Sequence, residues 1–351
     1  MNRFDKAGKK ESDMKKILVI LIAVFMVLPL FAQGAAESKA TETIVLKLGT
    51  PAPAGSMNYN NAVLMKEKLE ELSGGTMTLD IVPGAALGNV PQHFSQISQG
   101  TLDFFVVGSD ASIAFKGGED FFILGLPFLF RDEAHFNAFL KSDVLAEMSK
   151  ALEDASGIKL MGRFGARNPR GLSTTKTAVY SPSDLKGLII RIPENAMLTK
   201  VWNAYGASTA QSSGAEIFSG IQSGMFDGQE NGVDTVVDLG LTSIQQYYME
   251  LNQAFQSLFL WMSSKTWNKL TAQQQEWVAA AIAYADETAT AAFETETLPN
   301  YIKTIKDAGM TYITNAEINV QAFIDATKSI VPELEGNYFS VGLYDKIQAI
   351  K

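Results

Sequence analysis

The stretch GAEIFSGIQSGMFDGQENGVDT, residues 214–235, carries most of the information on the fold. Its first half has the spacing of a helix, and its second half contains the polar side chains of Asp227, Gln229, Glu230, Asn231 and Asp234. They could form a calcium loop, a catalytic pair, a solvated turn or one wall of a pocket for a polar ligand. A calcium loop needs oxygen ligands at alternating positions, whereas these acids have the spacing of a helix. Calcium is therefore disfavoured, and composition alone favours a solvated turn.

Strands alternate with helices along the rest of the chain. Hydrophobic periodicity predicts strands at 43–50, 76–84, 102–108, 158–164 and 188–192, and helices at 60–74, 92–100, 196–206, 214–225 and 271–296. Alternation of this kind is typical of a parallel sheet covered by helices. We expect an α/β protein with two lobes and several chain crossings between them.

Composition excludes some classes of partner. The 351 residues are 46% hydrophobic and 19% charged, which is typical of a globular chain with about two domains. The formal net charge is −9. Nucleic acids and anionic membrane surfaces are recognised through basic patches, so we expect neither as a partner.

The N-terminal residues have the pattern of an export signal. Lys15 and Lys16 precede the apolar run 17–32, which is short for a membrane span, and small residues follow it. We expect residues 1–36 to be a cleaved signal peptide, with residues 1–13 an upstream extension, and the remainder to be periplasmic. Cleavage would remove six basic and three acidic residues and change the net charge from −9 to −12.

Few features of the sequence support catalysis. There is no cysteine, and the two histidines are His93 and His135, so a cysteine nucleophile and a histidine-rich zinc site are excluded. Common hydrolase, nucleotide and metalloprotease motifs are absent. We expect no enzymatic activity, no cofactor and no metal. A hydrolase with paired carboxylates stays open, because such pairs form in space rather than in sequence.

Three segments together carry a family resemblance: GARNPRGLSTTK (165–176), SPSDLKGLIIRIP (181–193) and GAEIFSGIQSGMFDGQEN (214–231). In this order they resemble the DctP-type solute-binding proteins of tripartite ATP-independent periplasmic (TRAP) transporters. Shorter matches at 83–88, 97–106, 126–130 and 263–278 extend the similarity across nearly the whole chain after the leader.

The resemblance implies a site for a small organic acid. Arg191 matches the arginine that binds the ligand carboxylate in the family, a task suited to the planar fork of a guanidinium. Arg167 matches an arginine that makes a second polar contact, with Arg170 as its nearby rival. Asn231 matches the asparagine that ends the Gln-Glu-Asn segment, whose amide can donate to a carboxylate or hydroxyl. The neighbouring Glu230 is expected to support the backbone, because it would repel an anion.

Further contacts are expected from the other lobe. Candidates are the loop after the first strand, residues 50–58, and the regions of Gln92 and Ser109. The chain also departs from the family pattern. Gly232 stands where a proline is frequent, and residues 206–214 contain no proline. Since these changes flank the site, they bear on the identity of the ligand more than on the fold.

The resemblance further implies a two-domain periplasmic binding protein fold, type II-like and of the TRAP solute-receptor variety, with a long helix spanning both domains. We assign residues 42–165 and 256–296 to domain I, and 166–255 and 297–351 to domain II. The ligand would lie in the cleft, and its contacts with both domains would favour the closed form. In the family, this form delivers the ligand to a membrane permease driven by an ion gradient.

Two other functions are compatible with the same fold, and the first of them also with the same pocket. One is a ligand-sensing binding protein that signals to a receptor. The other is a binding protein of an ATP-driven (ABC) importer, which should lack the combination of the arginine strand with the DGQEN segment.

Overall fold

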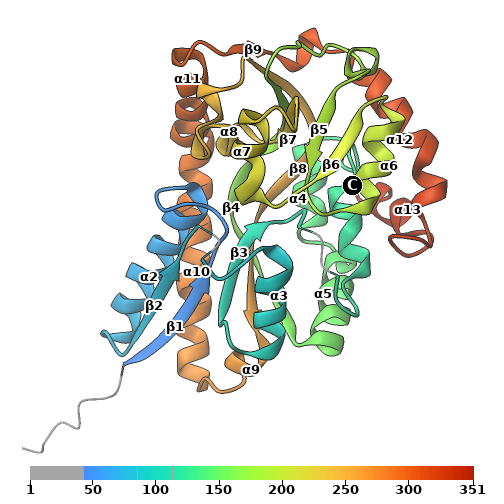
Figure 1. The fold of residues 1–351 in the computed structure, drawn as a ribbon. Helices are drawn as coiled ribbons and strands as arrows, with labels where there is room; N and C mark the ends of the chain where they lie inside the picture. The colour runs from blue at the N-terminus through green and yellow to red at the C-terminus, as the bar shows by residue number, and fades with distance from the viewer. Residues whose placement is uncertain (1–42, 85, 112–113) are drawn as a thin grey trace, which may run out of the picture. The chain divides into compact units, whose positions relative to one another are not determined.

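A mixed sheet organises the part of the chain that the computed structural model describes, residues 43–84, 86–111 and 114–351 (Figure 1). The predicted signal peptide lies outside these residues. The strand order is β2-β1-β3-β8-β4-β7-β5-β6, and β9 pairs with β8. The strands are β1 Ile44–Gly49, β2 Met77–Val82, β3 Phe104–Gly108, β4 Ile158–Thr174, β5 Ile189–Ile192, β6 Ser208–Gln211, β7 Gly228–Asn231, β8 Tyr247–Ser263 and β9 Thr311–Ile313.

Two long antiparallel strands, β4 and β8, form the centre of the sheet. Their pairing begins at Ile158 with Ser263 and ends at Thr174 with Tyr247, with several register shifts between. Pro169 lies at one of these shifts, which is where a proline is tolerated inside a sheet because the ladder is interrupted. The sequence predicted only the first part of β4 and did not predict β8.

Parallel strands flank this central pair on both sides. β1 pairs in parallel with β2 and β3, and β5 pairs in parallel with β6 and β7. The predicted parallel arrangement therefore holds within each half of the sheet, while β3 and β7 run antiparallel to β8 and β4.

Helices cover the sheet. They are α2 Met57–Ser73, α3 Val90–Gln99, α4 Glu133–Phe139, α5 Asp143–Ser156, α6 Ala196–Ala204, α7 Ile217–Gln222, α8 Val233–Asp238, α9 Ser264–Trp267, α10 Ala272–Ala292, α11 Leu298–Asp307, α12 Val320–Leu334 and α13 Leu343–Gln348. The predicted long helix is α10, which begins at a Thr271 capping box and continues through a π-helical turn into α11. It packs against α2 and β4. None of the helices in the described ranges is long and apolar enough to cross a membrane.

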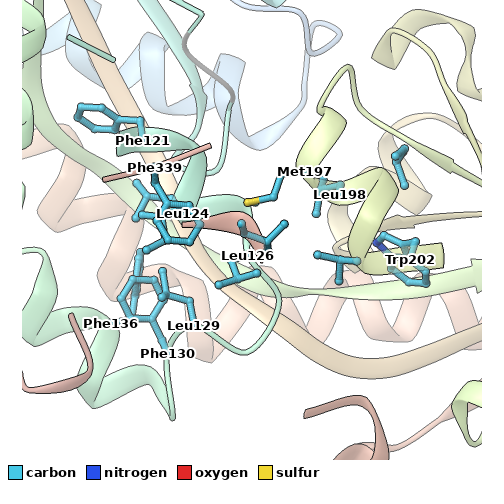
Figure 2. Close-up of a cluster of buried hydrophobic side chains, with 14 of the residues drawn as sticks. Phe121, Leu124, Leu126, Leu129, Phe130, Phe136, Met197, Leu198, Trp202 and Phe339 are labelled. Atoms are coloured by element: carbon cyan, nitrogen blue, oxygen red, sulfur yellow. The ribbon is translucent and has the colours of Figure 1, made fainter. Parts of the chain in front are cut away.

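One apolar cluster extends across the boundary that we predicted between the domains. Figure 2 shows Leu124 and Leu126 in the same cluster as Met197 and Trp202 of α6. A short 3₁₀ helix, Glu119–Gly125, and the loop after it bring the first two residues there. Residues 44–351 form one compact unit. The limits of the two domains stay a prediction.

Candidate functional site

A cavity of about 460 Å³ lies where the parallel strands β1, β3, β5 and β7 end. Ligands of open α/β sheets bind outside the carboxyl ends of such strands. The walls come from residues 51–53 after β1, the start of α3, the end of β3, residues 212–215 after β6, and both ends of α8. Among the described residues, three arginines line the cavity: Arg167 and Arg170 from β4, and Arg191 from β5.

Arg191 is buried at the cavity wall without a carboxylate partner. It is 3% exposed. Its Nε donates to Ser212 Oγ at 3.3 Å, and its Nη2 donates to the Ser212 carbonyl oxygen. None of the ion pairs in the described part of the chain includes it. Burial lowers the pKa of the guanidinium to about 10, which leaves it charged at neutral pH. A buried cation of this kind is costly unless an anion binds it.

Arg170 is paired on two sides. Its Nε donates to Glu230 Oε2 at 2.6 Å, its Nη2 donates to Glu230 Oε1 at 2.7 Å, and its Nη1 donates to Asp110 Oδ2 at 2.7 Å. Burial opposes its charge, but the carboxylates of Glu230 and Asp110 outweigh burial and raise the pKa of Arg170. The carboxylate of Glu230 therefore holds the side chain of Arg170 rather than the backbone that the sequence analysis expected it to support.

Arg167 is also held by internal partners. Its Nε donates to Asp234 Oδ2 at 2.6 Å, its Nη1 to Gln256 Oε1 at 3.1 Å and its Nη2 to Thr235 Oγ1 at 2.9 Å. The structure thus brings the predicted Arg167 to the cavity, but with Nε, Nη1 and Nη2 each already donating a hydrogen bond. Its contact with a ligand stays a prediction.

Four residues of the DGQEN stretch, 228–231, are buried rather than solvated, while Asp227 is exposed. Residues 228–231 form β7 between β4 and β5, and Asn231 lines the cavity with 7% of its surface exposed. Asn231 Nδ2 donates to Gln229 Oε1 at 2.7 Å, which fixes the amide and leaves one N–H for another acceptor. Asp227 accepts from the backbone N of Ile189 at 2.8 Å and holds the start of β5. The stretch is a pocket wall.

Two predicted contacts from the other lobe lie next to the cavity wall rather than in it. Gln92 is exposed, and its Oε1 accepts from Asn89 N at 2.8 Å in the capping box of α3. Ser109 is buried, and its Oγ accepts from Ser257 N at 3.2 Å. Neither Gln92 nor Ser109 is among the described residues that line the cavity, although Asn89 and Asp110 near them are. Their contact with a ligand stays a prediction.

Asp238 lies at the end of α8 in the cavity wall, and the sequence analysis did not identify it. Its Oδ1 accepts from Tyr301 Oη of α11 at 3.1 Å. Burial, and then the charge of Asp234, raise the pKa of Asp238 to about 7, against the opposing effects of Tyr301 and Arg167. Its partner lies 63 residues away, so no local pattern could reveal the pair.

We expect Asp238→Asn to stabilise the ligand-free protein at pH 8 and to change little near pH 4. The pKa is about 7 when folded and about 3.9 when unfolded, so ionisation of Asp238 costs folding free energy as the pH rises between these values. Asparagine cannot ionise, so at pH 8 the variant should gain about 1–3 kcal/mol of unfolding free energy after allowance for solvent screening. Urea unfolding at both pH values measures it, with the exposed Asp80→Asn as control. Equal gains in unfolding free energy at both pH values would contradict a raised pKa for Asp238.

Gly232 permits the packing of two polar side chains beside the cavity. A Cβ at this position would lie 2.4 Å from Asn168 Nδ2 and 2.4 Å from Asp234 Oδ1. A proline here would displace one of them, which gives a local reason for the glycine that departs from the family pattern.

Titratable side chains elsewhere do not gather into a metal site. The described residues contain no group of three or more His, Asp and Glu side chains that could hold a metal ion. His93 stacks on Phe105 with ring centroids 4.5 Å apart, and His135 Nε2 lies 2.8 Å from the Ile347 carbonyl oxygen. Both histidines are buried packing residues.

Known proteins are similar to this chain in sequence and in fold. The family model described as bacterial extracellular solute-binding protein, family 7 (DctP), matches residues 48–337. A solute-binding protein of Roseobacter denitrificans is 25% identical over 297 residues, covering 85% of this chain and 89% of the relative. The 2,3-diketo-L-gulonate-binding periplasmic protein of Escherichia coli is 25% identical over 291 residues, covering 82% and 86%.

Solved structures agree with the family match. A TRAP periplasmic solute-binding protein of Polaromonas sp. JS666, bound to D-erythronate, has a TM-score of 0.79 at 22% identity and covers 88% of this chain and 99% of that chain. One of Pseudomonas putida F1, with bound D-glucuronate, has a TM-score of 0.75 at 25% identity, covering 88% and 98%. The predicted fold class and resemblance are confirmed. The chain belongs to the DctP family, the bacterial extracellular solute-binding proteins of family 7.

Proposed function

We propose that this protein binds a small organic acid through Arg191 and delivers it to the membrane subunits of a TRAP permease. The observation that carries the proposal is a buried guanidinium that faces a cavity without an internal carboxylate. A ligand carboxylate would accept two parallel charge-assisted hydrogen bonds from the fork and supply the missing countercharge. The neighbouring Asn231 would donate its remaining N–H to the same ligand.

Closure around the ligand is part of the proposal. The cavity is lined from the predicted domain I by residues such as Pro53 and Asn89, and from the predicted domain II by Arg191. A ligand that contacts both walls binds the closed form better and shifts the equilibrium towards it. The ligands of two relatives support an acid, since the E. coli protein is named for binding 2,3-diketo-L-gulonate and a Vibrio cholerae protein for binding sialic acid.

Native mass spectrometry of the purified protein, followed by a thermal-shift screen of organic acids, tests the binding step. We expect a bound acid or a stabilising one, because a ligand present at about 100 times its Kd adds about 2.7 kcal/mol to the unfolding free energy. The acid should be recovered chemically unchanged, as expected of a binding protein without turnover. Failure of every carboxylic acid to bind would overturn the proposal.

Export and delivery are tested separately. We propose a periplasmic location, for which N-terminal sequencing of the exported protein should show that the leader has been cleaved. Uptake of the labelled acid into proteoliposomes that contain the permease should require this protein and an ion gradient. Binding without uptake, together with capture of a receptor in pull-downs, would favour the sensory alternative.

A further inference from the structure

Asp238 differs from the other acids of the cavity wall. Within the described part of the chain, Asp110 and Asp234 are ion-paired with arginines, and Glu194 is exposed to solvent. Asp238 is partly buried, and no lysine or arginine among those residues forms an ion pair with it. Its carboxylate instead accepts a hydrogen bond from the neutral hydroxyl of Tyr301, at 3.1 Å from Oδ1.

The surroundings of Asp238 disfavour its negative charge. It is the last residue of α8, where the free carbonyl groups of a helix end carry partial negative charge. Asp234 lies one turn earlier on the same helix, and Arg167 already donates its Nε to Asp234. Burial, and then the charge of Asp234, therefore raise the pKa of Asp238 to about 7, although Tyr301 and Arg167 lower it.

The other elements packed against α8 bring no unpaired cation to Asp238 in the described part of the chain. These elements are β4, β7, α11 and a 3₁₀ helix, Leu241–Ser243, which has no ionisable side chain. Their remaining charged groups have partners elsewhere: Lys159 with Glu153, Arg163 with Asp286, Arg170 with Glu230, Lys303 with Asp307, and Lys306 over the ring of Tyr312. Arg167 is thus the cation that faces Asp238, and Asp234 already neutralises it.

We propose that binding of an anionic ligand in this cavity is coupled to the uptake of a proton by Asp238, so that the affinity falls as the pH rises. This inference rests on the proposed function, because it requires the ligand to be an anion. An ionised Asp238 repels such a ligand. A neutral Asp238 does not, and its carboxyl group gains an O–H that can donate to the ligand.

The size of the cavity brings the two charges within reach of each other. A sphere of its volume, about 460 Å³, is about 10 Å across, which is close to the Debye length at physiological ionic strength. Salt therefore screens the repulsion only in part. A ligand that binds the neutral form about tenfold more tightly than the ionised form loses about sixfold in affinity between about pH 6.5 and pH 8.5, if the group titrates near pH 7 without ligand.

Titration calorimetry at pH 6.5, 7.5 and 8.5 tests the coupling. The probes are gluconate, glucuronate, pyruvate and benzoate, which stay ionised over this range, and the tightest binder is used throughout. We expect its affinity to be about sixfold lower at pH 8.5 than at pH 6.5. His93, beside the cavity residue Asn89, should contribute little, because burial lowers its pKa and keeps it largely neutral over this range.

Calorimetry in buffers of different ionisation enthalpy counts the proton directly and needs no variant. For a tenfold preference, about half a proton should be taken up per bound ligand at pH 7.5. Binding with no proton uptake at this pH would overturn the inference.

The variant Asp238→Asn tests the residue. Asparagine is neutral at every pH, so the variant should lose both the pH dependence and the proton uptake and should bind as tightly at pH 8.5 as at pH 6.5. Asp80→Asn is the control, because Asp80 is exposed and does not line the cavity, so this variant should keep both properties. An Asp238→Asn protein that is folded by circular dichroism and keeps the wild-type pH dependence would remove Asp238 from this role.

The outcomes separate this inference from the proposed function. Binding that Arg191→Ala abolishes but that does not change with pH would overturn the coupling and leave the carboxylate site in place. An absence of binding by all four probes and by every acid of the thermal-shift screen would overturn both.

Discussion

Arg191→Ala is expected to weaken binding of the organic acid by at least about tenfold, roughly 1.4 kcal/mol. The expected range for loss of a buried charge-assisted pair extends to about 2–5 kcal/mol. The reason is that Arg191 offers the cavity its unpaired guanidinium, and a ligand carboxylate has no equivalent partner in the described wall. The affinity of Arg191→Lys should lie between those of the wild type and of Arg191→Ala, since an ammonium keeps the charge but lacks the planar fork of the guanidinium. Calorimetry with the ligand found by native mass spectrometry measures the loss.

The same residue should have the opposite effect on stability. An uncompensated buried cation is costly, so Arg191→Met should leave the ligand-free protein as stable as wild type or more stable. Arg131→Ala is the matched control for binding, because this arginine donates to two backbone carbonyls, of Gln348 and Ile350, and does not line the cavity. Unchanged affinity in a folded Arg191→Ala protein would remove Arg191 from the site.

Glu230→Ala is expected to lower the unfolding free energy of the ligand-free protein by about 3–5 kcal/mol. Arg170 receives its strongest support from Glu230, through hydrogen bonds from Nε and Nη2 to the carboxylate. Removal of that carboxylate leaves a buried guanidinium with Asp110 as its remaining ion-pair partner. Urea unfolding followed by circular dichroism measures the change.

A surface pair supplies the control for this prediction. Glu153 pairs with Lys159 at 2.9 Å, with side chains 33% and 26% exposed, so Glu153→Ala should cost no more than about 1 kcal/mol. Replacement of Arg170 together with both of its acids, as Arg170→Met with Glu230→Leu and Asp110→Asn, leaves no unpaired buried charge and should recover most of the stability lost in the single variant. A loss below about 1 kcal/mol for Glu230→Ala would show that the buried pair contributes little.

Local sequence patterns predicted the first three strands and the long helix, but only part of the central strand β4 and none of β8. β1, β2, β3 and α10 follow from apolar periodicity and from caps such as Thr271. β7 was less accessible to sequence reasoning, because its Gln and Glu are stabilised by neighbouring strands rather than by their own strand propensity. Pro169 concealed the continuation of β4, since a register shift accommodates it.

The candidate site shows a similar division. Arg191 could be identified because a strand-borne arginine between isoleucines indicates an anionic partner, and the family resemblance supplied the ligand. The state of Arg167 and Arg170 could not be predicted, because their acids lie 67 and 60 residues away in sequence. Which arginine lacks a carboxylate partner depends on contacts between residues that are distant in sequence. Asp238 was not identified for the same reason, since its partner Tyr301 is also distant in sequence.

The pairing of β8 with β3 and β4 also constrains how the protein folds. A nascent chain cannot complete the half of the sheet that contains β3 before the end of β8 has left the ribosome, because β3 pairs with residues 258–262 and Ile158 pairs with Ser263. Until β8 is available, the edge of β3 that faces β8 in the sheet stays unpaired, although β3 is buried along its whole length in the native protein. Sheets built from such distant partners form slowly, and incomplete ones aggregate. The strand order therefore delays folding until most of the polypeptide exists, and it makes chaperone protection of β3 during synthesis an advantage.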